Sequence, residues 1–362
     1  VCEKTKLIHV VQKIQLGLSY DDVLLIPQYS EVGSRNDVDL SSKLTSKITL
    51  KIPIISANMS NVTGSDMAIS IGKIGGLGVI PRFMSQEDEA NLVSKVKKQK
   101  LTIGAAIGIR NGMFGRAETL LKAGADILFL DVAHGHMQKV LEAVSEFKNK
   151  YPKVDLVAGN VATYDAAVSI FTAGADSIKV GIGPGSICTT RIVTGSGVPQ
   201  ITAIMEASKA ARRVKKTLIA DGGAKNSGDI VKGLAAGASC LMLGNLLAGT
   251  DQSPGKKIKI NGKWFKSYNA STSRAEKKNH IRTNGDEFEK HYIKQIEGVE
   301  SLIPYKGPLS GVIENLISGV RSGLSYSGSN NIPVLWNKAK FIQITNLGLK
   351  ESLPHDVINK YD

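Results

Sequence analysis

The segment GIGPGSICTT, residues 181–190, places a cysteine inside a glycine-rich loop that directly follows an apolar run. Cys188 is one of only three cysteines in the chain, and Thr190 follows two positions later. Glycines let a backbone approach a ligand closely, and successive backbone N–H groups can hold a phosphate. A thiolate in such a loop can attack an electron-poor ring carbon while Thr190 shuttles a proton. The pattern indicates covalent chemistry at Cys188, with a simple tight turn as the alternative interpretation of the loop.

The other cysteines and the histidines carry weaker signals. Cys240 lies in an apolar run and Cys2 in the N-terminal segment, so we expect a barrel-core position and a disordered terminus for them. No histidine lies beside Cys188 in the sequence, which leaves a papain-like hydrolase unsupported. His134 and His136 stand two positions apart without a third ligand, a spacing that does not favour a metal site.

Eight short apolar runs alternate with helical patterns along the chain. They are PIISANM (53–59), GLGVI (76–80), TIGAAIG (102–108), ILFLDVA (127–133), DLVAGNV (155–161), SIKVGIG (177–183), TLIADGG (217–223) and SCLMLGN (239–245). Continuous apolar strands separated by amphipathic helices indicate a parallel sheet covered on both faces. Eight such units are the number that closes a (β/α)8 barrel, the TIM barrel. We therefore predict an α/β protein with a single (β/α)8 domain over residues 1–362.

The ends of the helices are also legible in the sequence. Ser85 opens the pattern SQEDEANLVSKVKKQ, and three acidic residues in the next four positions favour a helix N-terminus there. Three helical patterns end in similar small residues, KAGAD (122–126), TAGAD (172–176) and AAGAS (235–239). In each of them the glycine suits the left-handed position just after a helix.

One segment breaks this alternation. Residues 246–307 follow the eighth run without a clear core pattern, are rich in Lys, Ser and Asn, and lead to the helical pattern GPLSGVIENLISGVRSG. Long irregular segments in compact domains are mobile surface loops or functional lids. The insertion emerges at the C-terminal strand ends, where such barrels carry their active sites, so we expect a flap over the site.

Polar residues and glycines gather at the predicted C-terminal ends of the strands. These positions are Asn58, Met59, Asp131, Asn160, residues 181–190, Asp221, Gly222, Gly223, Gly244 and Asn245. A single Asp after a strand is often only a turn residue, but agreement between six strand ends predicts one site. The glycine-rich ends of the last two strands suit a phosphate. We therefore predict a nucleotide monophosphate site in which Asp221 binds the ribose hydroxyls.

The composition indicates which kinds of partner and which cellular compartment to expect. A formal charge of +14 favours anionic partners such as nucleotides or nucleic acid, although a basic surface without a function explains the charge equally well. Three scattered cysteines form no even disulfide framework and suggest a reducing cytoplasm. No apolar run approaches the roughly 18 residues of a membrane span, and the N-terminal segment is too charged for a secretory signal. We expect a cytoplasmic protein with no membrane partner.

Several motifs resemble those of the IMP dehydrogenase/GMP reductase family, in family order and over nearly the whole chain. They are GLSYDDVLLIP (17–27), KAGADILFLDVAHGH (122–136), AGNVAT (158–163), KVGIGPGSICTTR (179–191), IADGG (219–223), MLGNLLAGT (242–250) and IPYKGP (303–308). The stretch GPGSICTTR is highly specific. The resemblance implies a (β/α)8 barrel, usually a homotetramer, in which the loop cysteine bonds covalently to purine C2.

The resemblance also implies a role for each matching residue. Cys188 would be the nucleophile, Thr190 its proton-handling neighbour, and Glu297 an acid that bonds the purine ring. The expected substrate contacts, with those from the strand ends, are Asn58, Met59, Ser186, Asp221, Gly223, Gly244, Asn245 and Tyr268. The expected contacts of a nicotinamide cofactor are Asp131, Ala133, Asn160 and Gly181. The backbone carbonyls of Gly183, Gly185 and Cys188 match the family's potassium site, to which Glu351, Ser352 and Leu353 of a neighbouring subunit's tail would add ligands.

Features of both branches of the family occur in the chain. The dehydrogenases usually carry a CBS-type domain after the second strand, whereas here KKQK (97–100) leads directly into the third. The dehydrogenases hydrolyse the covalent intermediate with an Arg-Tyr pair on the flap, and residues 246–307 contain no such dipeptide. SANM (56–59) and DVA (131–133) resemble the reductases, but RIVTGSGVPQITAI (191–204) and LKESLPHDV (349–357) resemble the dehydrogenases. NAST (269–272) departs from the glycine-methionine pattern of both branches.

These features favour a GMP reductase-like enzyme that converts GMP to IMP and ammonia with NADPH. The alternative is an IMP dehydrogenase, which would use NAD and water to form XMP. From another class, a barrel without catalysis could bind nucleotides or RNA through the lysine-rich insertion, but stacking aromatic residues are sparse there. We therefore expect a purine mononucleotide as the partner, and no nucleic acid.

Overall fold

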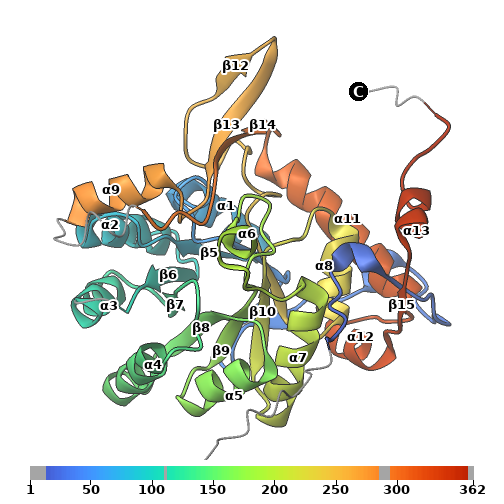
Figure 1. Cartoon of the computed structure of the whole chain (residues 1–362), viewed down its shortest axis with the longest axis horizontal. Helices are drawn as coiled ribbons and strands as arrows, with labels where there is room; N and C mark the ends of the chain where they lie inside the picture. The colour runs from blue at the N-terminus through green and yellow to red at the C-terminus, as the bar shows by residue number, and fades with distance from the viewer. Residues whose placement is uncertain (1–13, 110–111, 285–293, 358–362) are drawn as a thin grey trace, which may run out of the picture.

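The computed structural model describes residues 14–109, 112–284 and 294–357. Eight parallel strands close a barrel in the order β10-β11-β4-β5-β6-β7-β8-β9, and the helices lie outside it (Figure 1). The strands are β4 (Ile54–Ser56), β5 (Leu77–Ile80), β6 (Ile103–Ile107), β7 (Ile127–Asp131), β8 (Asp155–Val161), β9 (Ser177–Val180), β10 (Thr217–Asp221) and β11 (Cys240–Leu243). Each lies within one of the eight predicted apolar runs. The predicted (β/α)8 barrel is confirmed.

Helices connect the strands in sequence. They are α1 (Ser65–Ile74), α2 (Gln86–Lys97), α3 (Met113–Lys122), α4 (Gln138–Lys150), α5 (Tyr164–Thr172), α7 (Gln200–Arg213), α8 (Ser227–Ala235) and α11 (Leu309–Tyr326). Ser85 caps α2 by accepting a hydrogen bond from the backbone N–H of Asp88. Gly124, Gly174 and Gly237 adopt positive φ angles just beyond three helix ends, as the sequence predicted. Residues 98–102 alone separate α2 from β6.

The N-terminal end of the barrel is closed by a short hairpin of β2 (Ser42–Lys43) and β3 (Thr49–Leu50). Its hydroxyl groups bond residues at the start of two strands: Thr45 Oγ1 donates to Asp155, the first residue of β8, at 2.5 Å, and Ser42 Oγ donates to the carbonyl of Ser239, just before β11, at 2.6 Å. Leu44 between them is fully buried. The hairpin thus covers this end of the barrel, and the opposite, C-terminal end of the strands is where such barrels bind their ligands.

The remaining elements lie at the periphery. β1 (Val23–Leu25) pairs with β15 (Phe341–Gln343), and η1 (Tyr20–Asp22) and η2 (Arg35–Asp37) are single 3₁₀ turns. α12 (Ile332–Lys338) precedes β15, and α13 (Asn346–Glu351) lies on an arm at the edge of the molecule (Figure 1). Within the described ranges, no helix is long and apolar enough to cross a membrane.

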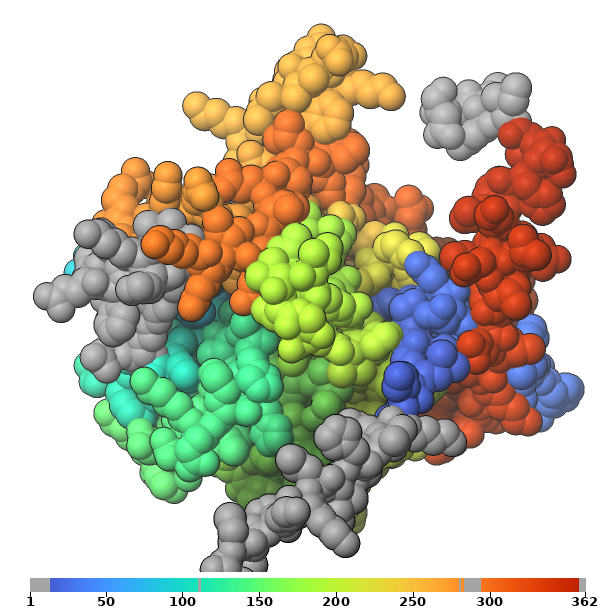
Figure 2. Space-filling view, viewed as in Figure 1, coloured from blue at the N-terminus to red at the C-terminus, as the bar shows by residue number. Residues whose placement is uncertain are grey.

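The insertion after β11 is more regular than the sequence predicted. It forms a three-stranded antiparallel sheet of β12 (Ile258–Ile260), β13 (Lys263–Asn269) and β14 (Glu300–Pro304). The helix α9 (Arg274–Asn284) lies between β13 and β14 in the sequence. The β12–β13 hairpin, gold in Figure 2, projects from the body of the protein. Its strand pattern was missed because Lys266 fills a buried position of β13, where its ammonium donates to the carbonyls of Thr250 and Ser253. A lysine on the inward face hides the usual alternation.

Candidate active site

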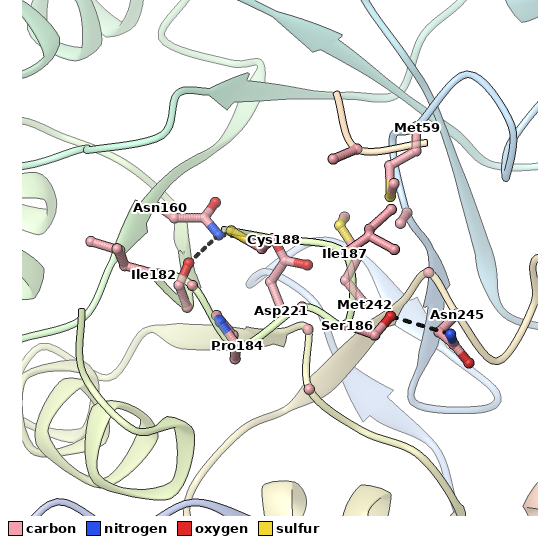
Figure 3. Close-up of a pocket in the computed structure, with 18 of the residues that line it drawn as sticks. Met59, Asn160, Ile182, Pro184, Ser186, Ile187, Cys188, Asp221, Met242 and Asn245 are labelled. Atoms are coloured by element: carbon pink, nitrogen blue, oxygen red, sulfur yellow. Dashed lines mark hydrogen bonds between the residues drawn. The ribbon is translucent and has the colours of Figure 1, made fainter. Parts of the chain in front are cut away.

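A cavity of about 680 Å³ opens at the C-terminal ends of the strands. This volume lies within the range of small-molecule sites, roughly 300–1,000 Å³. Most of the predicted site residues line it: Asn58, Met59, Asp131, Ala133, Asn160, Gly181, Gly183, Gly185, Ser186, Cys188, Thr190, Asp221, Gly223, Gly244, Asn245 and Tyr268. Figure 3 shows that Asp221 lies near Asn160 and that Ser186 lies beside Asn245. The structure thus brings together residues from segments far apart in the sequence.

Cys188 begins a hydrogen-bonded relay that ends on a carboxylate. The Cys188 thiol donates to Thr190 Oγ1 at 3.2 Å, and the Thr190 hydroxyl donates to Glu297 Oε2 at 2.8 Å. The thiol is partly exposed to the cavity. This geometry gives the thiol proton a path through one hydroxyl to an acceptor.

Glu297 reaches the relay because the insertion folds back onto the cysteine loop. Cys188 and Gly298 form an antiparallel bridge. On one side of it the Thr189 N–H donates to the carbonyl of Glu297 at 2.9 Å, and on the other the Val299 N–H donates to the carbonyl of Ile187 at 3.1 Å. The backbone of the flap is therefore fixed at the nucleophile, and the Glu297 side chain faces Thr190.

The cysteine loop is closed by an arginine that the sequence analysis missed. Arg191, at the start of the short helix α6 (Thr190–Thr194), donates from Nε to the carbonyl of Ile182 at 3.1 Å. Its Nη2 donates to the carbonyl of Val198 at 2.6 Å. One guanidinium thus joins the two ends of the loop that carries Cys188. The sequence TTR does not indicate this role, because both acceptors are backbone carbonyls, which every residue type carries.

The opposite part of the cavity is formed by the predicted phosphate-binding loops. Asn245 Nδ2 donates to Ser186 Oγ at 3.2 Å, which joins the loop after β11 to the loop after β9. A Cβ at Gly244 would lie 2.8 Å from the hydroxyl of Tyr268, so a side chain at this position would collide with that hydroxyl. Burial raises the pKa of Tyr268 to about 12, so its hydroxyl keeps its proton at neutral pH.

A buried lysine at the floor of the cavity links two of the predicted residues. Lys179 Nζ lies 3.0 Å from Asp131 Oδ1 and 2.6 Å from Asp221 Oδ2, and its side chain is only 4% exposed. Burial alone would lower the pKa of Lys179, but the carboxylates of Asp131 and Asp221 outweigh it and raise the pKa above its usual value. Asn160 Nδ2 also donates to Asp221 Oδ2, at 2.9 Å. The sequence analysis missed Lys179, whose place in an apolar strand run is the signal that could have identified it.

Asp131 has a second cationic neighbour, Arg82, which the sequence analysis also missed. Arg82 follows β5 and lines the cavity, with its Nε 4.0 Å from Asp131 Oδ2. Burial would raise the pKa of Asp131, but Lys179 and Arg82 together hold it below its usual value. Asp131 is therefore ionised at neutral pH.

The segment NAST forms part of the cavity wall. Ala270, Ser271 and Thr272 line it, and the Asn269 N–H donates to Asn61 Oδ1 at 3.0 Å. The part of the flap that departs from the family's glycine-methionine pattern is thus held against the loop after β4. The wall of the cavity therefore carries small side chains there, two of which bear a hydroxyl group.

Other predicted residues lie apart from the cavity. Glu351, Ser352 and Leu353 are exposed on the C-terminal arm, and this chain does not bring them to Gly183. Cys240 is buried in β11, where burial raises the pKa of its thiol to about 12. Cys2 lies outside the described residues. His136 Nε2 lies 3.1 Å from Ser169 Oγ, and the described ranges hold no cluster of three or more His, Cys, Asp or Glu side chains arranged for a metal ion.

Comparison with known proteins agrees with this architecture. Residues 17–355 match the family described as the IMP dehydrogenase / GMP reductase domain. The chain is 40% identical over 395 residues to an inosine-5'-monophosphate dehydrogenase of Borreliella burgdorferi, covering 95% of this chain and 98% of that protein. An inosine-5'-monophosphate dehydrogenase of Cryptosporidium parvum is also 40% identical, over 393 residues, with 96% of each chain covered.

A solved structure has the same fold. The crystal structure of a GMP reductase variant from Trypanosoma brucei, in complex with guanosine 5'-monophosphate, superposes with a TM-score of 0.90. It is 29% identical in sequence, and the match covers 95% of this chain and 99% of that one. Members of this family are oxidoreductases that act on purine mononucleotides and use a nicotinamide dinucleotide. The barrel, the cavity and these matches together show that the chain belongs to the IMP dehydrogenase/GMP reductase family.

Proposed function

We propose that the chain catalyses the reductive deamination of GMP, in which GMP, NADPH and two protons give IMP, NADP⁺ and ammonium. The covalent chemistry of this proposal rests on the relay from Cys188 through Thr190 to Glu297, and its reductive direction rests on the flap segment 246–307, which contains no Arg-Tyr pair. A thiol that must become a nucleophile needs a proton acceptor, and an amino group that must leave needs a proton donor. One carboxylate at the end of the relay supplies both functions in turn.

The chain's own residues account for the covalent steps. The Cys188 proton passes to Thr190 Oγ1 while the Thr190 proton passes to Glu297, which leaves a thiolate. The thiolate adds to C2 of the purine, and the proton held by Glu297 goes to the amino group, so that the C2–N bond breaks and ammonia leaves. A nicotinamide dinucleotide held in the cavity would supply the hydride that C2 then requires. The C2–S bond breaks, and the thiolate of Cys188 leaves as the purine is released.

The cavity presents polar groups that suit a mononucleotide on one side and a nicotinamide dinucleotide on the other. Ser186, Gly223 and Gly244 would hold the mononucleotide phosphate, with Asp221 at the ribose. Asp131, Ala133, Asn160 and Gly181 would face the cofactor. Two observations support a cofactor on this side of the cavity. The carboxylate of Asp131 is ionised and largely buried, and the Nε of Arg82 lacks a hydrogen-bond partner in the described residues.

IMP dehydrogenase is the second candidate, because the Borreliella and Cryptosporidium relatives carry that name at 40% identity over nearly their whole lengths. That reaction would end in hydrolysis of the Cys188 adduct, which requires a base for water. Both reactions begin with deprotonation of the Cys188 thiol, so the relay alone does not separate them. The flap does favour the reductase, because residues 246–307 contain no Arg-Tyr pair.

The products give a direct test of the reductase. The purified protein is incubated with GMP and NADPH, ammonia and IMP are quantified, and the oxidation of NADPH is followed by absorbance. We expect equal amounts of IMP, ammonia and oxidised cofactor. NADPH oxidation without ammonia release, or no oxidation at all with folded protein, would contradict the proposal.

The family resemblance suggests two further properties of the protein, which we propose together with this function. We propose that the chain acts as a single barrel domain in a homotetramer, and that potassium binds the carbonyls of Gly183, Gly185 and Cys188 with help from the Glu351–Leu353 tail of a neighbouring subunit. The Gly185 carbonyl already accepts the Cys188 N–H at 3.1 Å, but a carbonyl has a second lone pair for a cation. Light scattering and the dependence of turnover on K⁺ against Na⁺ test the two points.

A further inference from the structure

The N-terminal end of the barrel, opposite the cavity, carries a dense group of cations. The helices end and the strands begin at this end of a parallel barrel, and the β2–β3 hairpin covers it. We call the basic face the six segments that meet there: residues 42–51, 72–75, 97–102, 122–126, 148–154 and 212–216. These segments hold fifteen lysine or arginine residues and a single acidic residue, Asp126. The basic face therefore carries much of the formal charge of +14.

Contacts between the segments make the basic face continuous. A Cβ at Gly75, just after α1, would lie 2.5 Å from the Cβ of Lys51, which follows β3. Lys47 Nζ, in the turn of the hairpin, donates to the carbonyl of Lys153, in the loop after α4, at 2.7 Å. The hairpin thus adjoins α1 on one side and α4 on the other. The ends of α2 and α3 lie between these two helices, because β5, β6 and β7 are consecutive in the barrel.

Ion pairs neutralise only a small part of this charge. Three aspartates at the N-terminal ends of strands each accept one lysine: Asp126 pairs with Lys97 at 2.9 Å, Asp155 with Lys47 at 3.0 Å and Asp176 with Lys148 at 2.8 Å. Other lysines of the basic face are exposed and have no ion pair with a carboxylate among the described residues, for example Lys51, Lys73, Lys98, Lys100, Lys150 and Lys215. An unpaired surface of one sign attracts a ligand that carries many charges of the other sign.

The side chains around these cations indicate the kind of partner. Within the six segments, all of which the structure describes, Val214 is the one large apolar side chain that is exposed. Protein–protein interfaces have an apolar or aromatic centre and are depleted in lysine, and membrane-surface helices insert apolar side chains into the bilayer. Surfaces that bind nucleic acid are more polar and much more positive. The composition of the basic face therefore fits the phosphates of a nucleic acid.

We propose that the basic face binds the phosphate backbone of a double-stranded nucleic acid without reading its sequence. Reading the bases requires an element that enters a groove, and the hairpin does not project in this way, because Leu44 and Thr45 at its turn are buried against the barrel. The expectation of no nucleic acid rested on the lysine-rich insertion, where stacking aromatic residues are sparse. Phosphate contacts to a duplex require no stacking. The inference goes beyond the proposed reaction, whose cavity lies at the other end of the barrel.

The test measures the binding of defined duplexes. A labelled DNA duplex of about 30 base pairs, an RNA duplex of the same sequence and a second DNA sequence are titrated with the intact wild-type protein, and fluorescence anisotropy is read between about 50 mM and about 200 mM salt. We expect the dissociation constants of the three duplexes to agree within about tenfold, because the backbone alone is bound. The affinity should fall by about 10² or more across this range of salt, as expected for about four phosphate contacts.

A combined variant of the basic face locates the contacts. Lys73→Gln, Lys98→Gln and Lys153→Gln remove three exposed lysines from three of its segments. Binding at about 50 mM salt should weaken by about tenfold or more, and the slope of log K against log salt should become shallower by about two to three, since each lost phosphate contact removes roughly 0.9. Turnover should be unchanged, because the cavity lies at the opposite end of the barrel. Thermal unfolding confirms that the variant is folded.

An equal change of charge elsewhere serves as the control. Lys256→Gln, Lys259→Gln and Lys263→Gln together remove three exposed lysines of the insertion and should leave the dissociation constants within about twofold. Equal weakening by both combined variants would show only a general effect of net charge and would overturn the inference. It would also be overturned if no duplex binds at about 50 mM salt, if binding does not depend on salt, or if one DNA sequence is preferred by more than about tenfold. Attachment to phosphatidylserine vesicles by a protein that binds none of the duplexes would assign the basic face to a membrane instead.

Discussion

Thr190 donates a hydrogen bond of 2.8 Å to the carboxylate of Glu297, although 107 positions separate the two residues in the sequence. The contact exists because the flap returns from the projecting sheet and pairs with the Cys188 loop through Gly298. The proton path of the proposed reaction is therefore assembled from two segments, one from the barrel and one from the insertion. Changes in either segment should affect chemistry more than they affect substrate binding.

The thiol itself gives the first prediction. Cys188→Ser should abolish turnover, because a hydroxyl is a far weaker nucleophile than a thiolate at neutral pH. The affinity for GMP should stay within about tenfold, since the phosphate and ribose contacts lie elsewhere and dominate ground-state binding. Steady-state assays and calorimetry on the same preparation test both parts. Undiminished turnover would rule out the covalent mechanism.

The carboxylate at the end of the relay gives the second prediction. Glu297→Gln keeps the shape of the side chain but removes the proton acceptor, so kcat should fall by about 10² or more. The exposed Glu314 on α11 provides a matched control, and Glu314→Gln should leave kcat unchanged. A folded Glu297→Gln protein with wild-type kcat would show that the relay is not used.

Gly298 tests whether the flap backbone positions the relay. A Cβ there would lie 2.1 Å from the Cβ of Ala270 and 3.0 Å from Thr272 Oγ1, so an alanine must push the two flap segments apart. Gly298→Ala should lower kcat by about tenfold or more, as expected when a catalytic group is displaced. Gly311→Ala, in α11 with no atom close to its Cβ, should have no such effect. Wild-type kcat in Gly298→Ala would mean that Glu297 reaches Thr190 by another route.

Lys306 predicts a pH dependence of mononucleotide binding. Its ammonium donates to the carbonyls of Asn245 and Leu246, in the loop that also bonds Ser186. Burial lowers the pKa of Lys306 to about 8, so the group is charged below that pH and neutral above it. The loop is then held less firmly at high pH, and the KM for the mononucleotide should rise between about pH 7 and about pH 9.

Variants of Lys306 separate this effect from other titrations. Lys306→Arg remains charged throughout the range and should lose the rise in KM, whereas Lys306→Met should show a high KM at every pH. The pH profile of kcat serves as the internal reference, because within the described residues Asn245 bonds Ser186 and no hydrogen bond joins it to the relay. A rise in KM that persists unchanged in Lys306→Arg would assign the titration to another group.

Much of the barrel could be predicted because its strands are buried on both faces and therefore read as continuous apolar runs. The place of Cys188 in the cavity could be predicted because a glycine-rich loop carries this reactive side chain. Glu297 was assigned only by resemblance, since nothing in IEGVE shows that its backbone would pair with the loop at Ile187. The sheet of the insertion was missed because Lys266 occupies an inward position that an apolar residue usually fills.

Lys179 and Arg82 escaped prediction for a different reason. Each is a cation on or after a strand, and the carboxylates that surround them come from β7 and β10. A sequence shows the lysine in SIKVGIG and the arginine in VIPRF, but not that both converge on Asp131. Charges that match only in three dimensions have no periodic signature, so the polar floor of the cavity required the structure.

The most direct test of the central claim compares the two reactions of the family on one preparation of the wild-type protein. GMP with NADPH and IMP with NAD are each followed through the absorbance of the reduced nicotinamide, and XMP is measured by chromatography. We predict sustained oxidation of NADPH with GMP. With IMP we predict at most one equivalent of NADH per Cys188, because the Cys188 adduct forms but lacks the flap base for hydrolysis. Steady formation of XMP at roughly 1 s⁻¹ or faster, the low end of ordinary turnover, without turnover of GMP, would contradict the reductase and establish the dehydrogenase.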